Sequence, residues 1–220
     1  IIRLLEAWEL GLYRAAARVV TVTEAFRLNL ISRGVPGEKI VTIRNGADVE
    51  FWKPSAGCAD LRQSLGFSQE DFIVMYIGAH GISHGLESIV DSADKLRGHP
   101  RIRFLFVGEG ARKKPLIDEA EARKLTNIHF HDPVEKMRVR DFYALSAVCL
   151  VPLRNVPLFD SFIPSKMFEM MAMGRPVIGS VRGEAADILE ESGGALVVPP
   201  EDAGASVSYT HLRAHETKAN

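Results

Sequence analysis

The chain has 220 residues, which is enough for one large domain or for one domain and part of another. Hydrophobic residues make up 46%, charged residues 25%, and the formal net charge is −1, so composition gives no electrostatic reason to expect a nucleic acid partner. No apolar run reaches the ~20 residues that span a bilayer. The two cysteines, Cys58 and Cys149, suggest a reduced, cytoplasmic setting rather than a disulfide framework.

Both ends of the sequence suggest a piece of a longer protein. The chain lacks an initiating Met and opens inside an amphipathic pattern that includes Ile1, Leu4 and Trp8. Residues 207–220 resemble translated sequencing-adapter read-through, so we expect a non-native tail that forms no part of the core. His211 and His215 stand four residues apart, but no third ligand accompanies them, and no metal site is expected there.

The first fifty residues predict alternating helices and strands. Thr23 is a plausible helix cap, and Gly34 is a plausible helix end. The Asn45-Gly46 pair is a strong turn signal, because both residues tolerate positive φ. The expected helices cover 1–17 and 23–34, and the expected strands cover 18–22 and 39–43.

From residue 58 onward, short apolar runs alternate with helical patterns. Such alternation predicts a doubly wound α/β domain with a parallel sheet, which binds ligands at the carboxyl ends of its strands. The Arg112-Lys113-Lys114 run is expected to be a solvated helix face. The expected strands are 72–77, 102–107, 128–130, 148–151, 176–179 and 195–198.

A glycine-rich segment, Gly78-Ala79-His80-Gly81-Ile82-Ser83-His84-Gly85, follows the first of these strands. Glycines such as Gly81 let backbone approach a ligand closely, and a helix that begins just after them favours phosphate. His84 could donate a hydrogen bond to such a ligand, or carry charge when protonated. A tight structural turn with a solvated histidine explains the same residues.

A second candidate segment covers residues 162–178 and reads as a loop, a short helix and a strand. Ser165 is expected to cap this helix, which should place Lys166 in its first turn near free backbone N–H groups. Glu169 follows three residues later on the same face, so the pair could hold a phosphate and a ribose diol. The alternative is a surface ion pair with no ligand.

This segment resembles the donor-site signature of family 4 glycosyltransferases, which have the two-domain GT-B fold. The second glutamate of their E-x7-E pattern corresponds to Glu169, but Ser161 stands where the first glutamate is expected. The Pro164-Ser165-Lys166 run resembles a branch that acts in bacterial surface-polysaccharide synthesis. The resemblance covers most of residues 15–205 and includes Gly174, Pro176, Val177 and Ile178.

The resemblance implies roles for individual residues. In the family, an Arg and a Lys of the glycine-rich loop contact the donor diphosphate, and Ala79 and His84 stand at those positions here. Arg154 is a candidate replacement cation beside the donor loop. Glu169 would then bind the ribose hydroxyls, while the Asp132-Pro133-Val134 loop is where this fold meets the nucleobase.

The expected architecture is α/β of GT-B type. Residues 1–50 are expected to be the C-terminal remnant of the acceptor-binding domain, 51–57 the hinge, 58–206 the nucleotide-sugar (donor) domain and 207–220 the non-native tail. The acceptor half, which carries catalytic residues, would be missing, so the fragment itself is expected to be inactive. Peripheral membrane association would then involve the missing domain.

The implied reaction is transfer of a sugar, with retention, from a nucleotide-sugar to a glycan or lipid-linked acceptor. A UDP-sugar is the expected donor, and no cofactor or metal is expected, since the donor region has no D-x-D-like cluster. Two alternatives stay open at this point. They are a nucleotide-sugar 2-epimerase of GT-B fold and a non-catalytic nucleotide-binding domain.

Overall fold

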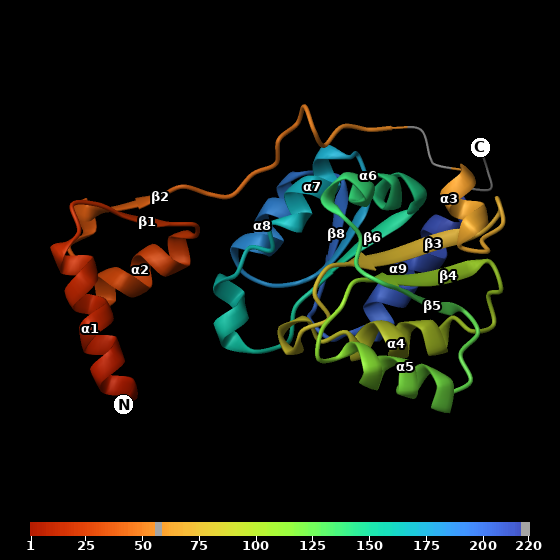
Figure 1. The fold of residues 1–220 in the computed structure, drawn as a ribbon, viewed down its shortest axis with the longest axis horizontal. Coiled ribbons are helices and arrows are strands. Elements are labelled where there is room, and N and C mark those ends of the chain that lie inside the picture. Colours follow the sequence, from red (N-terminus) through yellow and green to blue (C-terminus); the bar gives the residue numbers. More distant parts are fainter. Residues whose placement is uncertain (56–58, 217–220) are drawn as a thin grey trace.

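The computed structural model describes residues 1–55 and 59–216, with Tyr209 and residues 211–216 described by their backbone alone. Cys58, the end of the predicted hinge and residues 217–220 of the predicted tail therefore lie outside the described residues. The described chain forms a small lobe and a large lobe, joined by an extended segment that runs over the top of the large lobe (Figure 1). Within these described ranges, no helix is long and apolar enough to cross a membrane.

The small lobe contains a two-stranded parallel sheet with Val19 opposite Ile40. The Thr23 hydroxyl accepts a hydrogen bond from Phe26 N at 3.1 Å, and Gly34 takes a φ of +84° after the helix, as the sequence predicted. The elements of this lobe are α1 (Ile2–Ala15), β1 (Val19–Thr21), α2 (Glu24–Ser32), η1 (Gly37–Lys39) and β2 (Ile40–Thr42).

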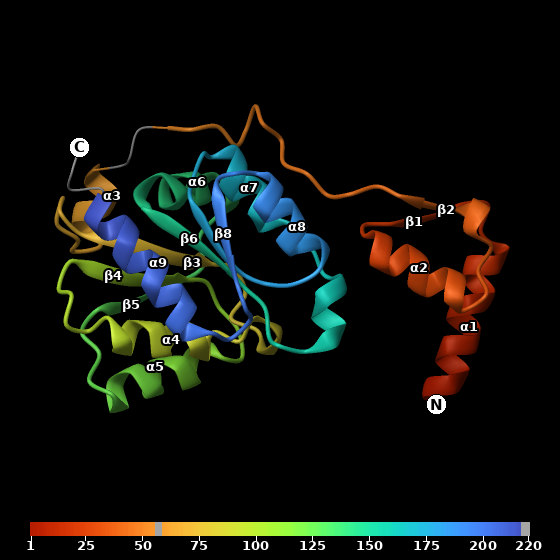
Figure 2. The same cartoon turned by 180° about the vertical axis from the view of Figure 1, so that it is seen from behind.

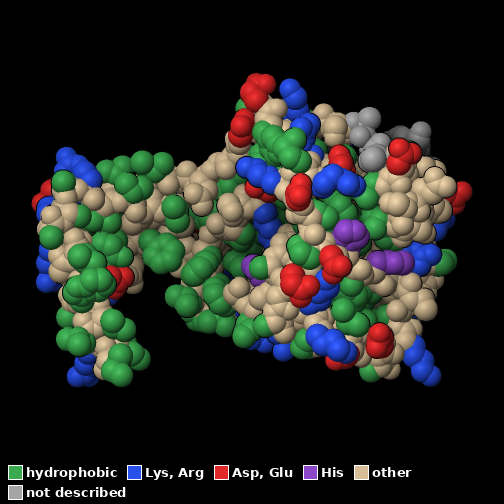
Figure 3. Space-filling model, viewed as in Figure 1, with side chains coloured by type: hydrophobic (Ala, Val, Ile, Leu, Met, Phe, Trp, Pro, Cys, Tyr) green, Lys and Arg blue, Asp and Glu red, His purple; other side chains and the backbone are tan. Residues whose placement is uncertain are grey.

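Much of the small lobe's apolar surface is exposed. Its buried core consists of only four large apolar residues among those described: Val19, Leu30, Val35 and Ile40. By contrast, Val20 and Val41 on the sheet are 59% and 44% exposed, and Trp8 on α1 is 67% exposed. Hydrophobic side chains accordingly cover a large part of this lobe in the space-filling view (Figure 3).

The large lobe is built around a parallel sheet of six strands in the order β5-β4-β3-β6-β7-β8. The strands are β3 (Phe72–Ile77), β4 (Ile102–Val107), β5 (Ile128–His131), β6 (Val148–Pro152), β7 (Val177–Ser180) and β8 (Ala195–Val198). Three of the predicted strands, those corresponding to β3, β4 and β8, match to the residue. Strands β3, β4 and β5 follow one another toward one edge of the sheet. The chain then returns to the middle, where β6 pairs with β3, and β7 and β8 follow toward the other edge. The point between β3 and β6 is where such a doubly wound sheet opens a crevice.

Helices cover both faces of this sheet (Figures 1 and 2). The apolar run of β3 explains why, since Ile73 and Met75 join the core on one face while Val74 and Tyr76 join the core on the other. One face carries α3 (Ala59–Ser64), α6 (Lys136–Leu145), α7 (Lys166–Ala172) and α8 (Glu184–Glu191), and the other carries α4 (Glu87–Lys95), α5 (Lys113–Ala122) and α9 (Ala203–Glu216). Two short 3-10 helices, η2 (Ile82–His84) and η3 (Pro157–Ser161), lie in the loops after β3 and β6.

The prediction that residues 207–220 stay off the core is wrong for the start of this segment. These residues continue α9, which packs beside α4 (Figure 2). Val207 packs against the apolar core of that face, and Thr210 is 2% exposed. Ala203, Val207 and Thr210 have the i, i+4, i+7 spacing of one helix face. The prediction took the Pro199-Pro200 pair as the end of the domain and did not use this spacing.

Candidate functional site

The loops after β3 and β4 cross each other at the crevice, and three glycines make the crossing possible. A Cβ on Gly108 would stand 2.0 Å from the Gly78 carbonyl oxygen, and one on Gly110 would stand 2.5 Å from the His80 carbonyl oxygen. All three glycines have φ between +140° and +153°. The predicted Gly81 has a φ of −94° and leaves ordinary room for a Cβ, so it is not a glycine that this loop requires.

Lys166 reaches from the start of α7 to the carboxyl end of β3. Its Nζ lies 3.4 Å from the Ile77 carbonyl oxygen and 3.9 Å from the centre of the Tyr76 ring. The side chain forms no ion pair with Glu169 or with any other described carboxylate, so the alternative of a surface ion pair is wrong. Burial lowers the pKa of Lys166 to about 7 from its ordinary 10.5. Lys166 therefore places an amine that is protonated below about pH 7, and that has no ion-pair partner among the described residues, at the point where the strand order reverses.

Glu169 lies one turn along α7, and a buried tyrosine on a neighbouring helix holds its carboxylate. Its Oε2 accepts a hydrogen bond at 3.0 Å from the hydroxyl of Tyr143, a side chain that is 1% exposed. The sequence pattern did not reveal this partner, because Tyr143 lies on α6, 26 residues away. Ser165 does not cap α7 with its side chain, contrary to the prediction, since its φ of −58° and ψ of −30° are helical and no cap hydrogen bond forms.

His84 does not carry the charge at neutral pH that was one of the two roles predicted for it. Burial, together with the nearby charge of Lys166, lowers the pKa of His84 to about 4, so the imidazole is neutral at pH 7. His80, which the sequence analysis did not select, is more deeply buried and packs edge-on against Phe106. Burial likewise lowers its pKa to about 4. Both rings lie beside Tyr76, so they shape the loop under Lys166 without adding charge.

Arg154 already has a partner. Its Nε lies 3.6 Å from a carboxylate oxygen of Glu201, and its backbone N–H donates to the Ser83 carbonyl at 2.9 Å. The residue thus joins the loop after β6 to the loop after β3. This pairing offsets its charge, which leaves Lys166 as the stronger candidate for binding an anion.

A pocket of about 290 Å³ opens beside the crossed loops. Its lining includes Gly78 and Gly108 together with the apolar side chains of Pro133, Val134 and Val139. A mostly apolar lining that also exposes backbone at two glycines suits a ring system with a polar edge. The predicted loop 132–134 therefore does border a cavity at the carboxyl ends of the strands.

Lys113 lies near this pocket, and its surroundings differ from those that the sequence predicted. Although the Arg112-Lys113-Lys114 run was expected to be solvated, Lys113 is 8% exposed. Its Nζ forms ion pairs with Asp132 at 2.7 Å and with Glu109 at 3.1 Å. A buried lysine between two carboxylates fixes the loop after β5 against the loop after β4.

Comparison with known proteins identifies the family. A family model described as glycosyl transferases group 1 matches residues 71–210. The chain belongs to this glycosyltransferase family. The matched residues include the two crossed loops, α7 and all six strands of the large sheet.

Two curated relatives of this glycosyltransferase chain come from bacteria. The colanic acid biosynthesis glycosyl transferase WcaI, so named in Escherichia coli K12, is 27% identical over 195 residues, which cover 86% of this chain and 47% of WcaI. The alpha-galactosylglucosyldiacylglycerol synthase of Streptococcus pneumoniae R6 is 28% identical over 174 residues, covering 76% of this chain and 44% of that protein. The chain therefore spans about half the length of these curated relatives.

Solved structures show that the glycosyltransferase chain has the GT-B type of fold. Anabaena Alr3699/HepE, in a crystal structure with UDP-glucose, superposes with a TM-score of 0.79 at 19% identity. The match covers 95% of this chain and 57% of that protein. The expectation of a GT-B type α/β fold is confirmed.

Proposed function

We propose that this chain is the donor-binding part of a glycosyltransferase that moves a sugar, with retention, from a UDP-sugar to a glycan or lipid-linked acceptor. The observation that carries the proposal is Lys166, an amine that forms no ion pair with a described carboxylate, in the crevice where the strand order reverses. Cleaving the bond between the sugar and the diphosphate leaves negative charge on the diphosphate. A fixed ammonium stabilises that charge more as it develops than in the bound donor.

The remaining parts of a nucleotide-sugar fit around Lys166. The pocket over Gly78 and Gly108 would hold the uracil ring, with its polar edge facing backbone groups of the loops. Glu169 would accept hydrogen bonds from the ribose hydroxyls through Oε1, while Tyr143 holds Oε2. In this proposal the donor is a substrate, and Lys166 supplies the positive charge without a resident cofactor or metal.

The names of similar proteins support the choice of donor and acceptor. Alr3699/HepE was crystallised with UDP-glucose, which supports a UDP-sugar as donor. WcaI is named for the biosynthesis of a polysaccharide, colanic acid, and the streptococcal relative for a glycolipid. We therefore propose a glycan or a lipid-linked sugar as the acceptor, with contact to the membrane surface outside the described residues.

The donor assignment can be tested by calorimetric titration of UDP-glucose into the 220-residue chain. Lys166→Met and Glu169→Gln each remove a charge-assisted contact, so each should weaken binding roughly ten- to a hundredfold, or ~1.5–3 kcal/mol. Lys114→Met is the matched control, because Lys114 is an exposed lysine that pairs with Asp118 on α5. Its affinity should equal that of the unaltered chain.

Two results would contradict the proposal. One is an unaltered chain that is folded by circular dichroism but binds no UDP-glucose at millimolar concentration. The other is binding that is indifferent to both Lys166→Met and Glu169→Gln. Either result would move the donor site away from α7.

A further inference from the structure

The small lobe contacts the large lobe through α2 and the segment after β2. The backbone N–H of Ala25 donates to Oε1 of Glu184 at 2.8 Å, and a guanidinium nitrogen of Arg44 lies 3.4 Å from Oε2 of the same carboxylate. The rings of Phe26 and Phe162 meet edge to face, with their centres 5.9 Å apart. Elsewhere a gap between the lobes is visible in the space-filling view (Figure 3).

Glu184 completes the cap of a helix that belongs to the other lobe. The first N–H groups of a helix have no partner within the helix, and they lie at its positive end. The Thr23 hydroxyl takes the N–H of Phe26, and Glu184 takes the N–H of Ala25. The side chain of Glu184 is only 16% exposed, so this charge-assisted hydrogen bond is shielded from water.

The turn that carries Glu184 is locked to η3. Gly183 has a φ of +63°, and a Cβ at this position would lie 2.0 Å from the Asp160 carbonyl oxygen in η3. Backbone therefore contacts backbone directly, with no room for a side chain between η3 and the start of α8.

Phe162 follows η3 directly and makes the second interlobe contact. Its ring also packs edge to face against Phe159 in η3, at 5.4 Å between centres. Lys166 comes four residues later. The segment that contacts the small lobe is thus the one that delivers Lys166 to the crevice.

We propose that Glu184 and Phe162 form an interlobe latch that positions the segment 157–165 and, through it, Lys166. Glu184 is a positioning residue: it touches α2 and Arg44, and it acts on the donor through the segment before α7. The latch itself depends on the contacts above, whereas its effect on donor binding rests on the proposed function. When the lobes separate, Glu184 and Phe162 lose their partners in the small lobe, and the segment that precedes Lys166 loses this support.

The latch is tested in the 220-residue chain with Glu184→Ala, Glu184→Gln and the control Glu190→Ala, which alters an exposed carboxylate on the same helix. Loss of the charge-assisted bond should speed hydrogen exchange of the Ala25 amide about tenfold in Glu184→Ala. The radius of gyration from small-angle scattering should rise in the same variant. Glu184→Gln keeps an acceptor oxygen and should restore most of both properties, and Glu190→Ala should match the unaltered chain.

UDP-glucose affinity is the second measurement, because it would not change if Glu184 only capped α2. Glu184→Ala should weaken UDP-glucose binding several-fold, and Glu184→Gln should recover most of the loss. Unchanged Ala25 exchange and an unchanged radius of gyration in Glu184→Ala would overturn the latch. A broken latch with full UDP-glucose affinity would overturn the positioning of Lys166. If the unaltered chain binds no UDP-glucose, the proposed function fails, while the exchange and scattering results still decide whether the lobes are latched.

Discussion

Lys166 is the residue whose surroundings set the properties of the candidate site. Its ammonium has the Ile77 carbonyl and the face of the Tyr76 ring as neighbours, but no carboxylate among the described residues. These neighbours orient the group without pairing it with a carboxylate, so no ion pair has to break when an anion binds to the ammonium. The hydroxyl of Tyr76 donates to the Ala79 carbonyl at 2.7 Å, which ties the glycine-rich loop to the same ring.

The lowered pKa of Lys166 predicts a pH dependence of donor binding. Burial sets the pKa to about 7 in the free chain, and a bound diphosphate would raise it because it favours the ammonium. Affinity for UDP-glucose, whose diphosphate does not titrate in this range, should therefore be full below pH 7. It should fall by up to about tenfold per pH unit above pH 7, until the pKa of the bound state is reached.

The control for this experiment is Lys166→Arg, because a guanidinium keeps its charge across the range and should remove the pH dependence. The histidines do not confuse the readout, since the pKa values of His80 and His84 are lowered to about 4. The stability of the chain should change in the opposite sense. The unfolded chain keeps the Lys166 proton up to about 10.5, so the free energy of unfolding should rise as pH increases above 7. Constant affinity from pH 6 to 9 would contradict the assignment.

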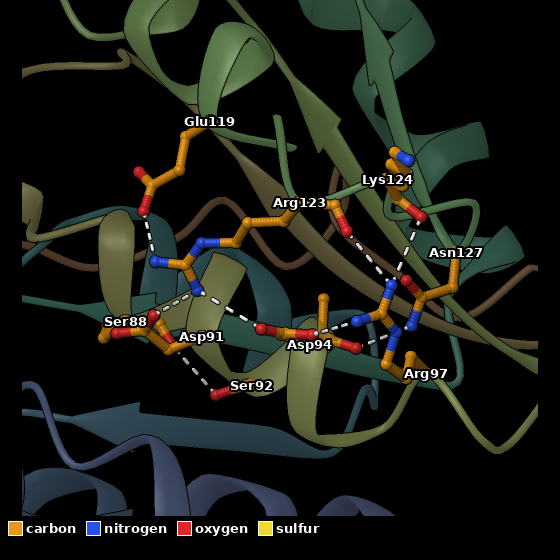
Figure 4. Close-up of polar contacts among 10 residues, drawn as sticks. Ser88, Asp91, Ser92, Asp94, Arg97, Glu119, Arg123, Lys124 and Asn127 are labelled. Carbon is orange, nitrogen blue, oxygen red and sulfur yellow. Dashed lines mark hydrogen bonds and ion pairs between the residues drawn. The ribbon is translucent and has the colours of Figure 1, made fainter. Parts of the chain in front are cut away.

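At the scale of elements, α4 and α5 are held together by charged side chains on the surface of the large lobe (Figure 4). Arg123, just after α5, forms ion pairs with Asp91 at 2.7 Å and Asp94 at 3.6 Å on α4, and also with Glu119. Arg97 pairs with Asp94 and donates to the Arg123 carbonyl at 3.0 Å. One arginine therefore connects two helices that cover the same face of the sheet.

Replacing Arg123 should loosen this pair of helices. Because several ion pairs share the guanidinium, Arg123→Ala should lower the free energy of unfolding by about 1 kcal/mol at low salt, and by less at high salt. Lys95→Ala, which alters an exposed cation on α4, is the control and should change stability little. Urea unfolding at two salt concentrations measures both variants. A loss that is equal at low and high salt would show that packing of the arginine stem, rather than charge, is responsible.

At the scale of the whole molecule, the two lobes differ in how well they bury apolar surface. In the large lobe, helices cover both faces of the sheet, whereas the sheet of the small lobe leaves Val20 and Val41 exposed. Two short paired strands with an exposed apolar face invite pairing with other copies. We therefore expect the small lobe to govern the solution behaviour of this chain.

The chain should self-associate in a concentration-dependent way, and Val20→Lys with Val41→Lys should suppress this association. Two charges on the exposed face oppose burial of that face against another molecule. Met137→Lys is the control, because Met137 is an apolar side chain that is 64% exposed on α6 of the large lobe and does not belong to the small sheet. Sedimentation velocity at several concentrations measures the effect. Association that persists in the double variant would place the contact elsewhere.

Local patterns in the sequence were enough to predict the elements and their class. The run Phe72–Ile77 is apolar throughout, which is typical of a strand buried on both faces, and β3 is buried at every position. Such patterns arise from neighbouring residues, so strand limits, the cap at Thr23 and the turn at Gly34 follow from them. The strand–helix alternation then implied a parallel sheet, and this placed the helix start that carries Lys166 and Glu169 at its carboxyl end.

The partners of the site residues depended on the tertiary structure. Glu169 meets Tyr143, Lys113 becomes buried beside Asp132, and Glu184 reaches an N–H group 159 residues away. Nothing in the spacing of these residues specifies the contacts, because they form where two helices pack together, where two loops meet and where one lobe touches the other. The pKa values of Lys166 and His84 are lowered by burial in the folded chain, which no local pattern records. The sequence by itself therefore determined which side chains stand at the carboxyl edge of the sheet, and packing decided which of them are buried and which form ion pairs.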